Sequence, residues 1–271
     1  MALAWEFQQA VMGRTGFIVA LCALAGLAAC GEHRPAAVAG AEVAAGPAGA
    51  DYAAPPAVLT VQATGADLSL SGSAAAGARV RLATPDGQAL FAGADAQGRW
   101  RLALGPLAAP RIYGLSAAGP GSGPAAQAQG YILATPAGEV ALLRAGASAM
   151  RIDRPAASGL RSLDFDRAGG AAVSAAVRPG ATVALRLDGR QIAQGRADAA
   201  GRFEASAPAP IPPGPHRLQI VGDGFADRAD VVVSPPAPLV QGPLRSQFTG
   251  GGLRVDWLTP GGGVQSTLLI H

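Results

Sequence analysis

The chain has 271 residues, of which 38 are glycine and 22 are proline, and only 14% are charged. Glycine and proline at this frequency argue against long helices and favour short strands joined by many turns. The net charge of +3 is too small to indicate a nucleic-acid-binding protein.

An apolar segment lies near the N-terminus. It runs from Phe17 to Leu27, follows the positive charge of Arg14, and is about half as long as a membrane-spanning helix needs to be. A short apolar segment after a basic residue is typical of a secretory signal peptide. We therefore expect residues 1–29 to be an export signal. A buried helix without an export role is the alternative.

This segment ends in Leu27-Ala28-Ala29-Cys30, an aliphatic residue and two small residues before a cysteine. The pattern resembles the lipobox of bacterial lipoproteins. That resemblance implies cleavage between Ala29 and Cys30, a diacylglyceryl group on the Cys30 thiol, and often acylation of the new amino group. Several acyl chains anchor a protein durably, whereas one binds only weakly. The alternative is an ordinary secretory signal in which Cys30 falls by chance.

This region also predicts the start codon and the membrane in which the protein is anchored. Trp5 and Glu6 are unusual ahead of a signal segment, so we predict that translation starts at Met12 rather than Met1. Gly31 follows the lipobox cysteine, where inner-membrane lipoproteins of enteric bacteria carry Asp. That resemblance favours the outer membrane, with the protein facing the periplasm or the surface. One cysteine remains after cleavage, so no disulfide is expected.

An internal repeat with an offset of 103 residues covers most of the remaining chain. Gly77–Leu82 aligns with Gly180–Leu185, and Ala94–Trp100 aligns with Ala197–Phe203. Gly77–Leu82 and Gly180–Leu185 each predict a turn at the glycine, followed by a strand whose alternation buries Val and Leu on one face. Ala94–Trp100 and Ala197–Phe203 each predict a turn with a positive-φ glycine, followed by a strand that buries Trp100 or Phe203. Asp-Gly hairpin signals lie between the blocks, at Asp86-Gly87 and, shifted by one residue, at Asp188-Gly189.

Further short runs with strand character follow Trp100 in the first repeat and Phe203 in the second, and they predict strands separated by Gly/Pro turns. These runs are Ile112–Leu115, Tyr131–Leu133, Val140–Leu143, Arg217–Val221 and Val231–Val233. The order of turn glycine, V-x-L, D-G and D-x-x-G-R-[WF] resembles tandem bacterial immunoglobulin-like domains. The resemblance implies an all-β fold with two β-sandwiches.

The predicted organisation has five parts. A helical signal peptide (1–29) and a flexible Ala/Gly/Pro-rich tether (30–56) precede the sandwiches at 57–145 and 146–236. Residues 237–271 form a β-hairpin extension, because a Thr259–Gly263 turn with a type II signature separates two apolar runs. Whether this hairpin completes the second sandwich is left open.

The sequence contains no residue pattern that indicates a catalytic or metal-binding site. The histidines, His33, His216 and His271, lie at no metal-ligand spacing to cysteine or carboxylate, and no G-x-S-x-G motif occurs. We expect neither an enzyme nor a cofactor. Two acidic groups invite a calcium interpretation, but they supply too few oxygens and are interpreted as solvated loop acids. They are Asp164 with Asp166, and Asp223 with Asp227.

An arginine stripe is the candidate binding surface. Strand alternation places Arg79 and Arg81 opposite Val80 and Leu82, and it places Arg99 and Arg101 opposite Trp100 and Leu102. If the two strands share a sheet, four guanidinium groups form a surface for anionic glycans or phosphates. The alternative is a solvated sheet face, since all 21 basic residues of this chain are arginine.

These observations predict a non-enzymatic, lipid-anchored envelope protein with a structural or protein-interaction role. Its partners would be the membrane, through the lipid, and an envelope protein or glycan, but not nucleic acid. A glycan-binding module that uses the arginine stripe is the first alternative. An enzyme on a sandwich scaffold is the second.

Overall fold

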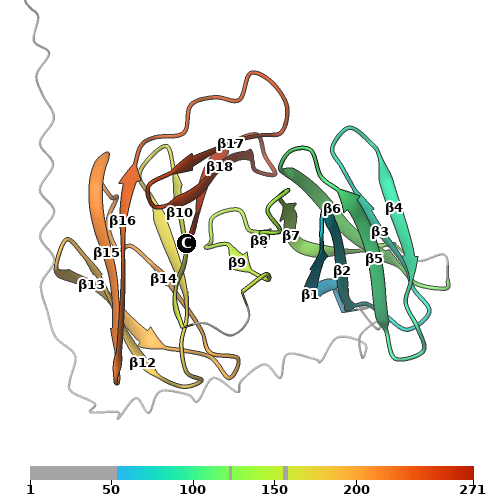
Figure 1. Cartoon of the computed structure of the whole chain (residues 1–271), viewed down its shortest axis with the longest axis horizontal. Coiled ribbons are helices and arrows are strands. Elements are labelled where there is room, and N and C mark those ends of the chain that lie inside the picture. Colours follow the sequence, from blue (N-terminus) through green and yellow to red (C-terminus); the bar gives the residue numbers. More distant parts are fainter. Residues whose placement is uncertain (1–53, 122–123, 155–157) are drawn as a thin grey trace, which may run out of the picture. The chain divides into compact units, whose positions relative to one another are not determined.

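The computed structural model describes residues 54–121, 124–154 and 158–271, and every regular element in these ranges is a β-strand (Figure 1). The described residues all lie within one compact unit. The predicted all-β fold is confirmed for the described residues. The signal peptide and residues 30–53 of the tether lie outside them.

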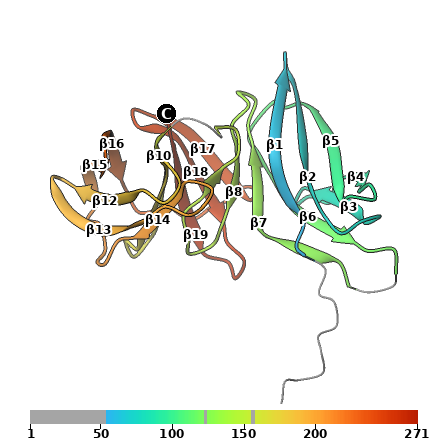
Figure 2. The same cartoon turned by 90° about the horizontal axis from the view of Figure 1, so that it is seen from below.

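The first sandwich consists of seven strands in two antiparallel sheets (Figure 2). One sheet has the order β1-β2-β5, and the other has β4-β3-β6-β7. The strands are β1 (Ala57–Thr64), β2 (Asp67–Ser73), β3 (Arg79–Ala83), β4 (Ala89–Gly93), β5 (Arg99–Pro106), β6 (Arg111–Ala118) and β7 (Ala126–Ala134).

The second sandwich repeats this order strand for strand. One sheet contains β14-β11-β10 and the other has the order β13-β12-β15-β16. In both sandwiches the first, second and fifth strands share a sheet, and the fourth pairs with the third, which is an immunoglobulin-like arrangement. The strands are β10 (Gly159–Asp166), β11 (Ala171–Ala176), β12 (Thr182–Leu187), β13 (Arg190–Arg196), β14 (Arg202–Ser206), β15 (Gly214–Gly222) and β16 (Phe225–Val233).

The repeated Asp-x-x-Gly-Arg turn has the same geometry in both sandwiches. Gly98 and Gly201 have φ values of 75° and 76°. A Cβ on either glycine would lie 2.3 Å from a backbone carbonyl oxygen, so the position requires glycine. The strand after each turn buries Trp100 or Phe203. The predicted roles of these blocks are confirmed.

The two Asp-Gly hairpins form as predicted, but with different loops. Asp188 and Gly189 both have positive φ, as a two-residue type I′ turn requires. In the first sandwich the loop is longer, and the Gly87 N–H donates to Thr84 O, 3.0 Å away. This difference in loop length accounts for the one-residue shift between the two signals.

Five more strands extend the sheets beyond the two sandwiches. β8 (Val140–Leu143) pairs with β7, and β9 (Met150–Arg151) pairs with β8. β17 (Leu244–Thr249), β18 (Gly252–Leu258) and β19 (Val264–Ile270) form a meander. β19 pairs with β10, so this extension continues a sheet of the second sandwich. The sequence had indicated only a hairpin here, and β17 is an addition.

The additional strands build a third hydrophobic core, separate from the core of each sandwich. One side of it comes from β6, β7 and β8, and the other from β18 and β19. Trp257 is fully buried in it, and its ring meets Tyr131 edge-on at 6.0 Å between centroids. The members of this third core are Ile112, Leu133, Ala141, Leu143, Ala149, Leu253, Val255, Trp257 and Leu269. The two sandwiches therefore share a packed core.

Candidate functional site

The predicted lipidation site, Cys30, and the predicted cleavage position between Ala29 and Cys30 lie outside the described residues. Both stay predictions, as does the start at Met12. In the part of the chain that is described, there is no helix with the length and apolar character needed to cross a bilayer.

The arginine stripe does not form as one surface. Arg79 and Arg81 lie on β3, whereas Arg99 and Arg101 lie on β5, and these strands belong to different sheets of the first sandwich. The two sheets enclose the apolar core between them. Because each pair projects away from that core, the two pairs lie on opposite outer faces. The hypothesis that depended on a shared sheet is therefore wrong.

Three of these arginines have local partners. The Arg99 guanidinium donates to Asp95 at 2.9 Å within the Asp-x-x-Gly-Arg turn, as Arg202 does to Asp198 at 2.8 Å. Arg101 donates to Gln62 and Ser69 across the sheet. Arg79 lies 4.1 Å from the centroid of the Phe91 ring. These contacts give the arginines structural roles in turns and on strand faces.

Two of the residues interpreted as solvated loop acids are wholly or partly buried on strands: Asp227 on β16 is half-buried and accepts from the Leu160 N–H at 2.8 Å, and Asp164 is buried, with only 2% of its surface exposed. Asp164 lies on β10, between β11 and β19, on the sheet face that carries the third core. Alternation along β10 places Leu163 and Phe165 in the core of the second sandwich and leaves Asp164 facing the first. The interpretation of Asp164 as a loop acid is therefore wrong.

Four hydrogen-bond donors surround the Asp164 carboxylate. Thr267 Oγ1 donates to Oδ1 at 2.5 Å, and Gln265 Nε2 donates to it at 3.2 Å. The Ala149 backbone N–H and Ser162 Oγ lie 2.7 and 2.9 Å from Oδ2. We define the Asp164 cluster as Asp164 with Ser162, Ser174, Gln265 and Thr267. Burial raises the pKa of the Asp164 carboxyl to about 6, and these hydrogen bonds only partly offset the effect.

The loop between β8 and β9, residues 144–149, is fastened to this cluster, and we call it the junction loop. Its Gly146 N–H donates to Gln265 Oε1 at 2.9 Å, and Gln265 Nε2 lies 3.1 and 3.3 Å from the carbonyls of Arg144 and Ala147. Ser174 Oγ donates to the carbonyl of Ala149 at 2.8 Å. Polar side chains of β11 and β19, in a sheet of the second sandwich, thus bind the backbone of a loop that connects two strands of the first sandwich's sheet.

A second buried carboxylate, Asp256, lies on the opposite face of the same sheet. It accepts from Arg254 Nε at 2.8 Å, from Arg245 at 2.5 Å and from Ser266 Oγ at 2.6 Å. Burial acts to raise the pKa of Asp256, but the Ser266 hydroxyl and the two guanidinium groups outweigh it and hold the pKa below its ordinary value. Arg254 also donates to Ser234, which follows β16. We call these five residues the Asp256 cluster.

His216 is held in a local ion pair. Its Nδ1 lies 2.7 Å from Asp188 and its Nε2 lies 2.8 Å from the Pro212 carbonyl. Both acceptors favour a ring that is protonated at both nitrogens; burial lowers the pKa of His216, but these bonds outweigh it and the pKa is raised. The arrangement ties β15 to the Asp188 turn. Within the described residues, no three His, Cys, Asp or Glu side chains are grouped as a metal site.

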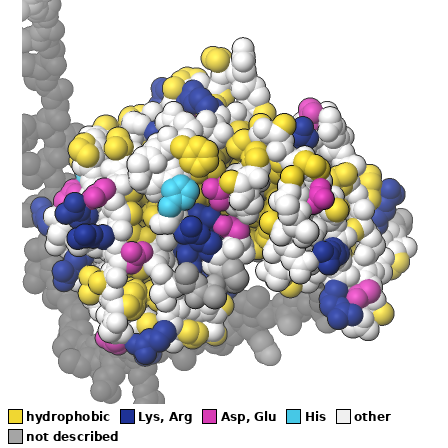
Figure 3. Space-filling model, viewed as in Figure 1, with side chains coloured by type: hydrophobic (Ala, Val, Ile, Leu, Met, Phe, Trp, Pro, Cys, Tyr) yellow, Lys and Arg dark blue, Asp and Glu magenta, His cyan; other side chains and the backbone are white. Residues whose placement is uncertain are grey.

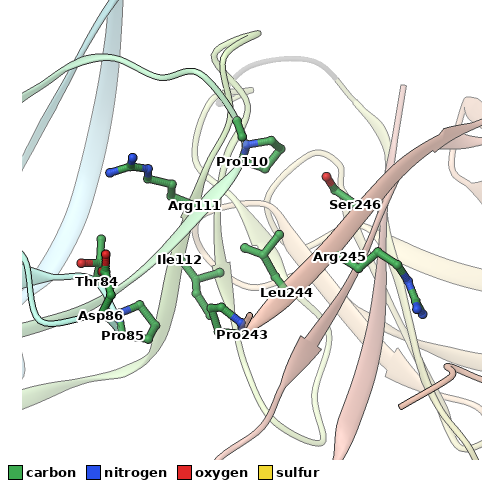
Figure 4. Close-up of a pocket in the computed structure, with 11 residues that line it drawn as sticks. Thr84, Pro85, Asp86, Pro110, Arg111, Ile112, Pro243, Leu244, Arg245 and Ser246 are labelled. Atoms are coloured by element: carbon green, nitrogen blue, oxygen red, sulfur yellow. The ribbon is translucent and has the colours of Figure 1, made fainter. Parts of the chain in front are cut away.

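A cavity of about 450 Å³ opens beside β17 (Figure 4). Ile112 and Leu244 point toward one another in it, while the guanidinium groups of Arg111 and Arg245 extend away to opposite sides. β17 is an edge strand, and its Phe248 is 69% exposed. This part of the surface offers apolar contacts and the unpaired edge of a sheet.

Basic and acidic side chains are interspersed on the face shown in Figure 3, without a large area of one sign. Exposed ion pairs also occur among the described residues, such as Arg217 with Asp230 at 2.7 Å and Arg202 with Asp198 at 2.8 Å. The visible charge distribution therefore gives no preference for a strongly charged polymer.

No protein-family model matches the chain, and no curated protein matches it. Among solved structures, the chain is similar to the BSP domain of a biofilm-associated protein, with 15% identity over 69% of this chain and 30% of that one, and a TM-score of 0.24. It is also similar to a central fibronectin-III array of RIM-binding protein (13% identity, 83% and 92% covered, TM-score 0.25).

A third similar structure is a tetra-tandem repeat from the extending region of a large adhesion protein, with 15% identity, 78% and 55% covered, and a TM-score of 0.24. The chain spans less than a third of the solved chain of that BSP-domain structure. Similarity at these identities and TM-scores carries no information about the function of the chain.

Proposed function

We propose that this chain is a lipid-anchored protein of the bacterial envelope that presents two rigidly joined immunoglobulin-like modules in a structural or protein-interaction role. Three features support the proposal: the lipobox pattern that ends at Cys30, the tether that follows it, and the two joined sandwiches. Of the two membranes, the outer one is favoured by Gly31.

The third core is the observation that carries the proposal. Sandwiches joined only by a linker reorient freely, whereas a shared core with buried hydrogen bonds resists reorientation. Trp257, Val255 and Leu269 have no exposed surface, and they pack against strands of the first sandwich. A pair of modules held in this way suits a spacer or a platform that sets the position of a partner.

The tether sets the distance over which this platform acts. From Cys30 to Pro56, a fully extended chain reaches at most about 90 Å. The cavity beside β17 and the exposed Phe248 supply a surface for an envelope partner. The glycan-binding alternative loses its basis, because its four arginines lie in two sheets.

The test is intact-mass analysis of protein purified from bacterial membranes, with Cys30→Ala as the comparison. We expect the wild-type mass to correspond to a chain that begins at Cys30 and carries acyl groups. The variant should be neither acylated nor cleaved at this site. A wild-type chain that is soluble and not acylated would overturn the anchoring.

A further inference from the structure

Asp164 and Gln265 bind the junction loop from opposite ends. Gln265 holds Gly146 and the carbonyls of Arg144 and Ala147, and Asp164 holds the N–H of Ala149. Gln265 Nε2 and Asp164 also contact one another at 3.2 Å, so the two sites form one network. The loop connects β8 and β9, which belong to the first sandwich's sheet, so these hydrogen bonds fasten that sheet to β10 and β19.

We propose that Asp164 and Gln265 form a latch that fixes the first sandwich on the second, and that this latch holds more tightly in mild acid than at neutral pH. The latch consists of these two side chains and the backbone of the junction loop. Its closed state is the arrangement described above. In its open state the loop lifts from β10 and β19, and water reaches the carboxylate.

The surroundings of the carboxylate determine the direction of the pH effect. Its direct partners, from β10, β19 and the junction loop, are neutral. Ser174 on β11 and Trp257 on β18, which donates to Thr267, are neutral as well. The absence of a cation among these described partners distinguishes Asp164 from Asp256.

Charged side chains on the elements packed around Asp164, such as Asp166, Arg144, Glu204 and, beside β9, Arg151 paired with Asp153, are not among its direct partners. Asp166, two residues along β10 on the same face, accepts from the N–H groups of Ala168 and Gly170. Arg144 in the junction loop pairs with Glu204 on β14 at 2.5 Å. This pair is balanced in charge, so it favours neither form of the Asp164 carboxyl strongly.

The difference in the pKa of Asp164 between the closed and open states determines whether closure is favoured by acid or by base. In the closed state, burial raises the pKa of Asp164 from 3.8 to about 6, and opening the loop returns it toward 3.8. The closed state therefore binds a proton more tightly than the open state. Closure is most favourable below the open-state pKa and is weakened as the pH rises through the closed-state pKa. Between about pH 5 and about pH 7.5, we expect the opening constant to rise about tenfold.

Hydrogen exchange of the full chain, followed by mass spectrometry, tests both parts of the proposal. The measured quantity is the protection of peptides that contain the Ala149 amide, at about pH 5 and about pH 7.5, after correction for intrinsic exchange rates. The wild type should lose about tenfold in protection at the higher pH. Asp164→Asn, which cannot ionise, should show no such loss.

The matched control is Asp166→Asn, which changes an exposed carboxyl on the same strand and face. It should retain the wild-type pH dependence. Gln265→Leu should lower the protection of residues 144–147 at both pH values, because it removes the bonds to the loop backbone. Ser162→Ala removes one donor to the carboxylate, so its pH dependence should be steeper than that of the wild type.

Two results would overturn the proposal. Equal protection of the wild type at both pH values would remove the acid dependence. Unchanged protection of residues 144–147 in Gln265→Leu would remove the latch itself. If Asp164→Asn fails to fold, Ser162→Ala and Asp166→Asn still decide whether the pH effect originates at Asp164.

Discussion

The two faces of the sheet formed by β10, β19, β18 and β17 each bury a carboxylate, and the two carboxylates behave in opposite ways. Asp164 faces the first sandwich and is surrounded by neutral donors, and burial raises its pKa. Asp256 faces the core of the second sandwich between two arginines, and its pKa is lowered. Burial is similar, with 2% and 4% of each residue exposed. The cationic partners therefore decide the direction.

The two carboxylates stabilise different contacts of the same sheet. The Asp256 cluster ties β17, β18 and β19 to Ser234 through a buried ion pair, which is costly to break on one side. The Asp164 cluster ties the two sandwiches together through hydrogen bonds to a loop backbone. Breaking the Asp256 cluster should damage the second sandwich, whereas breaking the Asp164 cluster should loosen the junction loop at the contact between the two sandwiches.

The largest expected effect comes from Asp256→Asn. The substitution leaves the buried guanidinium of Arg254 without its anion, so we expect the free energy of unfolding to fall by about 3–5 kcal/mol. Urea denaturation measures this loss. Asp230→Asn breaks an exposed pair with Arg217 and should leave the denaturation midpoint nearly unchanged. Similar losses in both variants would contradict the role given to the buried pair.

An intermediate effect is the pH dependence, which should have opposite signs at the two carboxylates. The stability advantage of the wild type over Asp164→Asn should decrease by about 3 kcal/mol as the pH rises from below 3.8 to above 6, because the folded-state pKa is raised by about two units. The advantage over Asp256→Asn should be present above 3.8 and should disappear as the pH falls through the lowered pKa. Denaturation series across pH measure both, and parallel curves would contradict the comparison.

The smallest expected effect comes from Glu204→Gln. It removes the pair with Arg144, in which 21% and 38% of the two side chains are exposed, so we expect a loss of about 0.2–1 kcal/mol. Urea denaturation measures the loss, and hydrogen exchange of residues 144–149 should hardly change. A large change in the exchange of residues 144–149 would show that the Arg144–Glu204 pair, and not the Asp164 cluster, holds the junction loop.

Local sequence patterns were sufficient to predict the turns and the buried strand faces of the two repeated sandwiches. Gly98 and Gly201 set the same turn, and Val80, Leu82, Val183 and Leu185 are fully buried as alternation predicts. Such features depend on neighbouring residues and on backbone sterics, so a single sequence reveals them.

The junction was missed because its signals depend on distant partners. Val140–Leu143 and Leu268–Ile270 are continuous apolar runs, which indicate strands buried on both faces, but the runs do not say which sheets cover them. Asp164 looks like a surface acid until β19 and the junction loop enclose it. The arginine stripe failed for the same reason, since alternation predicts the face of a strand but not the sheet that contains it.

The central claim is that the two sandwiches form one rigid pair. Spin labels at Ala96 and Ala199, equivalent exposed turn positions of the two sandwiches, test it in the full chain with Cys22 and Cys30 replaced by alanine. Electron–electron distance measurements should give one narrow distribution. A broad distribution, as expected for domains on a flexible linker, would contradict the claim.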